Sequence, residues 1–262
     1  LPLHFGEANV RVNYVEWLND RWRPEQAGVE NAKRYYDQAA DLYVAPPNEL
    51  VRKRSNWSRS VAEDARKQWF PDHNDTDMRL LEQWLATNEP AFQKLRAGAQ
   101  TPRYWPTYET DTTDLGDPNF LADAMAELPH YRKVTLAFKE RIAYQVYQGD
   151  VDGALEDCLV VWQFGRHMQG KGLLNEQLVG IAIEAVGSQS ILPILQQCEV
   201  AAATLERVQR GITRMIDSHR PVIDLDGEEV FWRDRIQRTF TDDGQGDRKS
   251  VRVGKECATG CR

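Results

Sequence analysis

Apolar residues between positions 131 and 169 recur at the three- and four-residue intervals of amphipathic helices. Small and apolar positions mark one face of the second predicted helix: Val151, Ala154, Leu155, Cys158, Leu159, Trp162 and Gly165. Asp150 precedes this face as an N-cap, and Gly149 stands where the first helix needs a left-handed residue. Such a short connection predicts that the two helices pack side by side and antiparallel, so residues 139–170 form the core of a helical hairpin.

The same periodicity predicts helices along most of the chain. They cover residues 8–20, 29–44, 78–95, 120–128, 173–197, 201–218 and 227–240. Pro90 is expected to kink or split the third of these, Pro129 to end the fourth, and Pro193 to mark a boundary if 173–197 is a helix pair. Runs with the two-residue alternation of strands are almost absent. We therefore predict an all-α fold, an irregular helical bundle of stacked antiparallel hairpins.

Irregular sequence interrupts these helices at two places. Residues 101–118 are rich in proline and mark a candidate sub-boundary within one domain that spans residues 1–241. Residues 242–262 follow the last helix, and after Asp247 they carry five basic residues against the single acid Glu256. This composition predicts an irregular, solvated basic tail.

The predicted hairpin resembles a known repeat. Ala143, Gly149, Asp150, Ala154 and Leu155 stand at the spacing of the inter-helix turn in tetratricopeptide-type (TPR) repeats, where small residues let two helices approach. The resemblance covers one hairpin and implies a TPR-like pair in the second half of the chain. The turn does not recur at a period of about 34 residues, so a regular array is not predicted.

Composition and charge narrow the classes of function. The 262-residue chain of 30.1 kDa contains 41% hydrophobic and 28% charged residues, as globular proteins do. A net charge of −7 and a pI near 5.4 argue against a nucleic-acid partner. No run of about 18 apolar residues predicts a membrane span, and no signal peptide opens the chain. Because it begins with Leu1 rather than Met, membrane attachment through an upstream segment stays open.

One carboxylate is out of place on an apolar helix. Glu184 lies inside the apolar run 181–186, Glu176 lies eight residues earlier near the same face, and Arg166 and His167 end the preceding helix. One hypothesis is a polar pocket in which a carboxylate acts as general base or ligand beside His167. The alternative is an ion pair between Glu184 and an arginine, or a partly exposed face.

An aromatic loop supplies a candidate binding site. Arg103, Tyr104 and Trp105 follow one another between Pro102 and Pro106. If they are exposed, they are suited to stacking on a sugar or gripping a peptide. If they fold back, they plug the core of the bundle.

No cofactor or metal is predicted. Asp243, Gln245 and Asp247 alternate as the first ligands of an EF-hand-type calcium loop do. Arg248 stands where that loop needs glycine, so a polar turn is the competing interpretation.

The cysteines do not point to one chemistry. Cys158 lies on an apolar helix face and Cys198 at a helix end, so both are expected to be small core residues. Cys257 and Cys261 are four residues apart in the tail. A disulfide between them would close a very small loop, and a metal site would need two further ligands.

Two stretches resemble an uncharacterised family of bacterial helical proteins. They are GDVDGALEDCLVVWQFGRHMQG with the following LNEQLVGIAIEA, and GEEVFWRDRIQRTFTDDGQGD. Members of that family often carry an N-terminal membrane anchor, so the resemblance implies an extracytoplasmic or membrane-anchored location and no known activity. In similar sequences the acidic turn continues with Asp-Gly, whereas here Asp247 precedes Arg248, which argues further against calcium.

Two classes of function remain. The first is a helical interaction or scaffold module that holds a partner helix or peptide in a groove. The second is an enzyme or small-ligand binder with a carboxylate–histidine pocket around Glu184. The first is favoured because the sequence lacks a complete catalytic set: it has no His-Glu-x-x-His and no Gly-x-Ser-x-Gly, and Pro129 interrupts its one Glu-x-x-His, Glu127 to His130.

Overall fold

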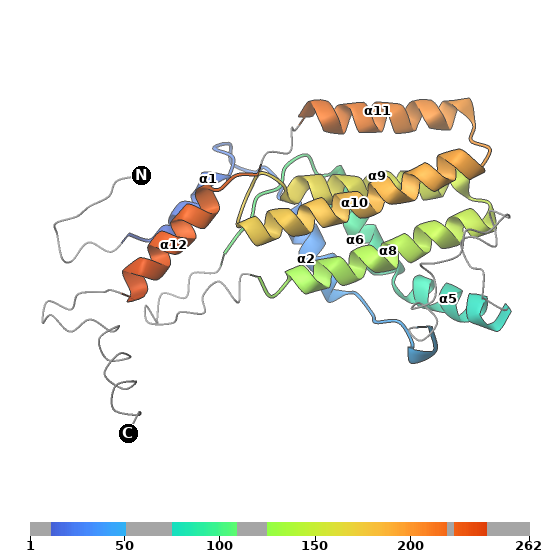
Figure 1. Cartoon of the computed structure of the whole chain (residues 1–262), viewed down its shortest axis with the longest axis horizontal. Coiled ribbons are helices and arrows are strands. Elements are labelled where there is room, and N and C mark those ends of the chain that lie inside the picture. Colours follow the sequence, from blue (N-terminus) through green and yellow to red (C-terminus); the bar gives the residue numbers. More distant parts are fainter. Residues whose placement is uncertain (1–11, 51–74, 109–124, 219–222, 240–262) are drawn as a thin grey trace, which may run out of the picture.

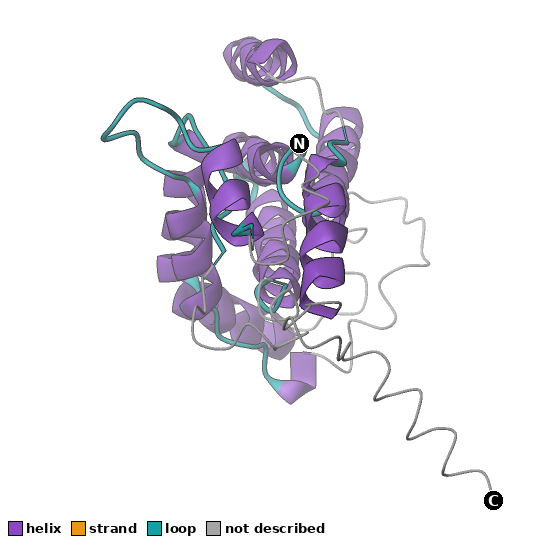
Figure 2. Ribbon diagram, turned by 90° about the vertical axis from the view of Figure 1, so that its left-hand side faces the viewer, coloured by secondary structure: helices purple, strands orange, loops and turns teal. Residues whose placement is uncertain are grey.

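The computed structural model describes residues 12–50, 75–108, 125–218 and 223–239. All regular secondary structure in these ranges is helical (Figures 1 and 2), which confirms the all-α prediction. The helices are α1 (Tyr14–Arg21), α2 (Lys33–Asp41), α5 (Asp75–Thr87), α6 (Glu89–Gln100), α8 (Leu128–Gln148), α9 (Val151–Met168), α10 (Leu174–Gln197), α11 (Ala202–Ser218) and α12 (Asp226–Thr239). The longer ones stack side by side, while α1 and α12 pack together at one end (Figure 1).

Helices α8 and α9 form the predicted antiparallel hairpin. Helix α8 ends at Gln148, and Gly149 takes up a left-handed conformation with a φ of 85°. The carboxylate of Asp150 accepts a hydrogen bond of 3.0 Å from the N–H of Gly153. Both residues satisfy backbone groups that helix ends leave without intrahelical partners, so the turn follows from local sequence.

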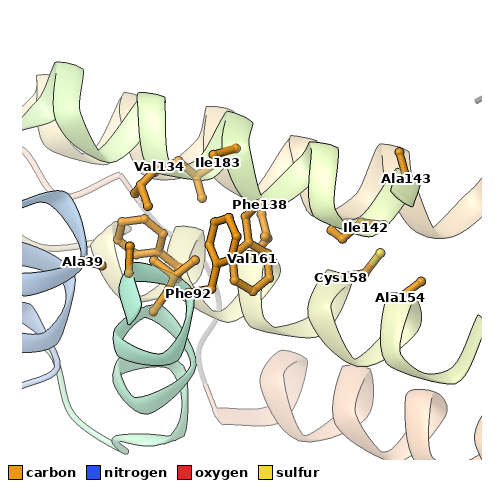
Figure 3. Packing of buried hydrophobic residues seen from close by; sticks show 14 of the residues in the cluster. Ala39, Phe92, Val134, Phe138, Ile142, Ala143, Ala154, Cys158, Val161 and Ile183 are labelled. Atoms are coloured by element: carbon orange, nitrogen blue, oxygen red, sulfur yellow. The ribbon is translucent and has the colours of Figure 1, made fainter. Parts of the chain in front are cut away.

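Helix α9 lies at the centre of the bundle, where α6, α8 and α10 contact it. Figure 3 shows Phe92 of α6, Phe138 of α8 and Val161 of α9 meeting in the core. The rings of Phe92 and Phe138 pack edge to face with centroids 5.1 Å apart. Cys158 is fully buried in this core as expected, whereas Cys198 is half-buried.

Where Gly165 faces Gly180, the backbones of helices α9 and α10 approach with no side chain between them. A Cβ atom on Gly165 would lie 2.4 Å from the backbone nitrogen of Glu184 and 2.5 Å from the carbonyl oxygen of Gly180. A Cβ atom on Gly180 would lie 2.7 Å from the carbonyl oxygen of Gly165. A larger residue at Gly165 or Gly180 would therefore push the helices apart, and glycine sets their spacing.

Of the three prolines that the sequence singled out, one differs from its prediction. Helices α5 and α6 are separate, as a split at Pro90 predicts, and Pro90 lies in the first turn of α6. Pro129 was expected to end a helix but begins α8, where its missing N–H costs no hydrogen bond. Residues 174–197 form a single helix, one of the two alternatives, and Pro193 lies inside it between the buried Ile191 and Ile194.

Amide side chains fasten the irregular segments to the helices. In four places one Asn or Gln side chain accepts from the backbone N–H and donates to the backbone carbonyl of the same residue, at 2.7 to 3.2 Å. The pairs are Asn19 with Tyr108, Asn31 with Trp105, Asn88 with Val44, and Gln177 with Asp224. These amides satisfy backbone groups that lack helical partners, which lets the segments lie against the core.

The close contact of α9 and α10 predicts the effect of enlarging Gly165. We expect Gly165→Ala to lower the free energy of unfolding by about 2 kcal/mol, because the new methyl group meets rigid backbone atoms of α10. Gly211→Ala is the matched control: its Cβ atom meets only the flexible end of the Leu159 side chain, at 2.9 Å. Urea denaturation of both variants measures the difference, and equal stabilities would contradict the prediction.

Candidate functional site

Glu184 lies half-buried between α10 and α9, at the level of the close backbone contact. The indole Nε1 of Trp162 donates to its carboxylate at 2.5 Å, and Nη1 of Arg166 lies 3.3 Å from the same oxygen. The side-chain amide of Gln169 donates to the other oxygen. Three donors from α9 and its C-cap thus surround this carboxylate, and the ion pair with an arginine that the sequence left as an alternative is present.

His167 faces a different side of α9. Its Nδ1 shares a hydrogen bond of 2.7 Å with the hydroxyl of Tyr36 in α2, and its ring stacks on Tyr104 with centroids 6.2 Å apart. Both tyrosines are buried, and burial raises the pKa of each hydroxyl well above its usual range. His167 therefore belongs with the tyrosines of α2 and the 101–108 segment, while Glu184 belongs with Trp162.

Glu176 occupies a third position, at the buried start of α10. Its Oε2 accepts the hydroxyl of Tyr108 at 2.5 Å and the N–H of Leu173 at 2.7 Å. The second bond is one half of a capping box, in which a glutamate in the first turn of a helix accepts from the backbone N–H of the N-cap residue. Burial raises the pKa of Glu176 above its ordinary value of 4.5, although both hydrogen bonds act to lower it. Glu176 thus caps α10 and anchors Tyr108, and it shares none of these partners with Glu184.

A polar cluster that the sequence did not reveal joins α2 to the start of α8. The Nζ of Lys33 lies 2.9 Å from a carboxylate oxygen of Asp37 and 2.8 Å from one of Glu127. The hydroxyl of Tyr131 donates to Asp37 and, at 3.2 Å, to Glu127. Burial disfavours the charged form of Lys33, but the two carboxylates outweigh it and raise its pKa. The only sequence signal is the four-residue spacing within each helix, which is common.

The aromatic loop folds back over the bundle. Tyr104 and Trp105 are buried, whereas Arg103 is exposed. Lys171 donates to the carbonyl of Tyr104 at 2.8 Å, and its Nζ lies 5.9 Å from the centre of the Tyr104 ring. Burial and the nearby charge of Arg103 lower the pKa of Lys171 to about 8. Of the three residues that the sequence proposed for binding, the two aromatic ones pack inward and the cation faces solvent.

An open groove runs between α9, α11 and the end of α6. Its volume of about 520 Å³ falls within the roughly 300–1,000 Å³ of known ligand sites. It is lined by Ala99, Gln100, Thr101, Pro102, Leu159, Val160, Gln163, Gly211, Arg214 and Met215. Apolar atoms dominate its walls, and Arg214 is the one charged residue among those lining it. Helix α11 lies outside the bundle, against α9 (Figure 1), and so forms one side of the groove.

A second hollow, of about 580 Å³, lies between α5 and α8. Glu89 and Arg141 line it, and both belong to a network of ion pairs. Arg141 bonds to Glu89 at 2.6 Å and to Asp157 at 2.8 Å. Arg96 bonds to the same two acids at 3.1 and 2.9 Å, which closes a four-residue ring. This ring ties α6, α8 and α9 together, and its charges are satisfied from within.

Metal ligation has no support in the described part of the chain. There, no three His, Cys, Asp or Glu side chains gather in a way that could hold an ion. The calcium candidates Asp243, Gln245 and Asp247 lie outside the described residues, as do Cys257 and Cys261.

Comparisons with known proteins add no relative. A scan against protein-family models finds no match, and searches of curated proteins and of solved structures find none.

The buried position of Glu176 predicts a pH effect on stability. Because its pKa is raised on folding, the folded state holds the proton more tightly than the unfolded state. Stability should therefore fall as pH rises from about 4 through the folded pKa. In Glu176→Gln that fall should be smaller, because the amide oxygen still accepts from Tyr108 and Leu173 without becoming charged. Chemical denaturation between pH 4 and pH 8 gives the free energy of unfolding of both proteins. Parallel pH profiles would contradict a raised pKa at Glu176.

Proposed function

We propose that this chain is a helical interaction module that holds an amphipathic helix of a partner protein in the groove between α9, α11 and the end of α6. The observation that carries the proposal is the open apolar groove, about 520 Å³ in volume, with a single cation among its lining residues. Helix-in-groove recognition needs such a surface: an apolar trough for one face of the incoming helix, and polar groups at the rim that fix its orientation.

The chemistry of the groove suggests the character of the partner. Leu159, Val160 and Met215 offer aliphatic contacts, and methionine adapts to differently shaped side chains. The positive charge of Arg214 favours a carboxylate on the polar side of the partner helix. We therefore infer a partner segment with Leu-, Met- or Phe-rich anchors on one face and an acidic residue beside them.

The carboxylate–histidine pocket has less support. Glu184 accepts from Trp162, Arg166 and Gln169, which take up three of the about four acceptor positions of a carboxylate. His167 is engaged with Tyr36 and Tyr104 on another side of α9. An acid and a base that act together on a substrate must reach the same reacting atom, and these two side chains have different surroundings.

Selection of helical peptides from a phage-displayed library tests the proposal. We expect enriched peptides to be amphipathic and acidic, and to lose at least tenfold in affinity for Gln163→Trp, which fills the groove, and for Arg214→Glu, which reverses its charge. Arg210→Glu is the matched control, because Arg210 lies on the same helix, pairs only with exposed Glu206 and does not line the groove. Peptides that bind the wild-type protein and all three variants with equal affinity would exclude the groove as the binding site.

A further inference from the structure

Helix α10 presents an apolar face to solvent. Leu178, Ile181, Leu192 and Leu195 are 47%, 40%, 60% and 39% exposed, although large apolar residues usually lie inside. Its buried residues, among them Gly180 and Ile183, lie on the opposite side and pack against α9 and α8. In Figure 1 the helix lies nearest the viewer and uncovered along its length.

The exposed residues follow the spacing of a coiled-coil seam. Leu178, Ile181, Ala185, Ser188, Leu192 and Leu195 are separated by alternating intervals of three and four residues. These are the a and d positions of a heptad repeat, which place a continuous stripe on one side of a helix. The core-facing residues of α10 do not share this register, so the stripe is a second, separate apolar face.

The order of residues along the stripe is self-complementary. Leu178 and Leu195 lie equally far from the midpoint between Val186 and Gly187, and so do Ile181 and Leu192. When two identical helices cross antiparallel about a two-fold axis, residues at equal distances on either side of the axis face each other. Leu178 would then meet Leu195 of the second copy, and Ile181 would meet Leu192.

The middle of the stripe suits the same arrangement. Ala185 and Ser188 are the pair nearest the axis, and both are small and half-exposed. Small residues at a crossing point let helix backbones come close, while the larger side chains on either side interdigitate.

The charges of α10 favour a second copy over a lipid surface. Its only charged residues are Glu176, which is buried, and Glu184, which is bound by Arg166. Two copies would therefore meet without like-charge repulsion. α10 is the one helix in the described ranges that is long and apolar enough to cross a membrane. It has no Lys or Arg, which argues against a helix that lies on lipid headgroups. Its inner face packs against α9 and its Glu184 pairs with Arg166 of that helix, which argues against a helix that crosses the bilayer.

We propose that two copies of this chain form an antiparallel, two-fold dimer through the outer face of α10. Leu178, Ile181, Leu192 and Leu195 of each copy make the contact, and Ala185 and Ser188 mark the crossing point. This surface is separate from the groove beside α11, so the dimer leaves that groove open. A single helix stripe is smaller than the roughly 800 Å² per partner of standard interfaces, so the dimer should dissociate on dilution.

Sedimentation equilibrium of the 262-residue chain tests the dimer and its register. The wild-type protein should shift with concentration from 30.1 kDa to twice that mass. Ile181→Glu and Leu192→Arg should each weaken association at least about 100-fold, because each buries two unpaired charges against apolar residues.

An equimolar mixture of the two variants should recover the dimer. In the antiparallel register Glu at 181 of one copy faces Arg at 192 of the other, and the second contact keeps the wild-type Leu192 and Ile181. A parallel register would not bring these positions together, so failure to recover while each variant stays folded by circular dichroism would overturn the proposed register.

Leu136→Glu on α8 is the control, because Leu136 is similarly exposed but lies off the stripe, and it should dimerise as the wild type does. A wild-type chain that stays at 30.1 kDa up to millimolar concentration would overturn the dimer. Flotation with vesicles of anionic and zwitterionic phospholipid tests whether the stripe binds a lipid surface instead of a second copy of the chain. A monomer that binds these vesicles, and loses binding on Ile181→Glu, would assign the stripe to a lipid surface and also overturn the dimer.

Discussion

The backbone contact between α9 and α10 determines much of what surrounds it. Because Gly165 and Gly180 carry no side chains, the two helices approach until backbone atoms of one meet those of the other. At this spacing the side chains of Trp162 and Arg166 reach the carboxylate of Glu184. The buried residues of α10, among them Gly180 and Ile183, lie on the side that packs against α9 and α8. Leu178, Ile181, Leu192 and Leu195 lie on its other side and face outward.

The interior of the bundle contains charged groups from several helices, and two networks pair them with one another. The ring of Arg96, Arg141, Glu89 and Asp157 joins three helices without drawing on solvent. Lys33, Asp37, Glu127 and Tyr131 join α2 to α8 in the same way. Such networks specify which helices pack together, because a wrong pairing would leave buried charges unsatisfied. The surfaces suited to recognition are instead the apolar ones.

Local sequence predicted the features that local physics controls. The turn at Gly149 and Asp150 was predictable because a left-handed glycine and an N-cap carboxylate act within a few residues. The burial of Cys158 followed from its place in the periodic stripe. Pro129 was misjudged because proline ends one helix or begins the next with equal ease, and the flanking pattern did not decide between them.

Long-range contacts were not predictable from one sequence. The arginine pair of Glu184 was among the alternatives, but its indole donor Trp162 was not, since neither residue signals the other over that separation. His167 was grouped with Glu184 because it lies beside Arg166 at the end of the neighbouring helix, but a helix turns by about 100° between neighbouring residues. That rotation is what directs His167 toward Tyr36 and leaves Arg166 facing Glu184.

The amide side chains that fasten the irregular segments also bear on how the molecule ages chemically. Asn19, Asn31 and Asn88 each use both atoms of one amide, an oxygen that accepts and a nitrogen that donates. Deamidation replaces that nitrogen by oxygen with almost no change of shape. The new carboxylate would turn toward a backbone carbonyl, so an attraction becomes a repulsion between two acceptors. The contacts that hold the irregular segments against the helices thus depend on a functional group that water slowly hydrolyses.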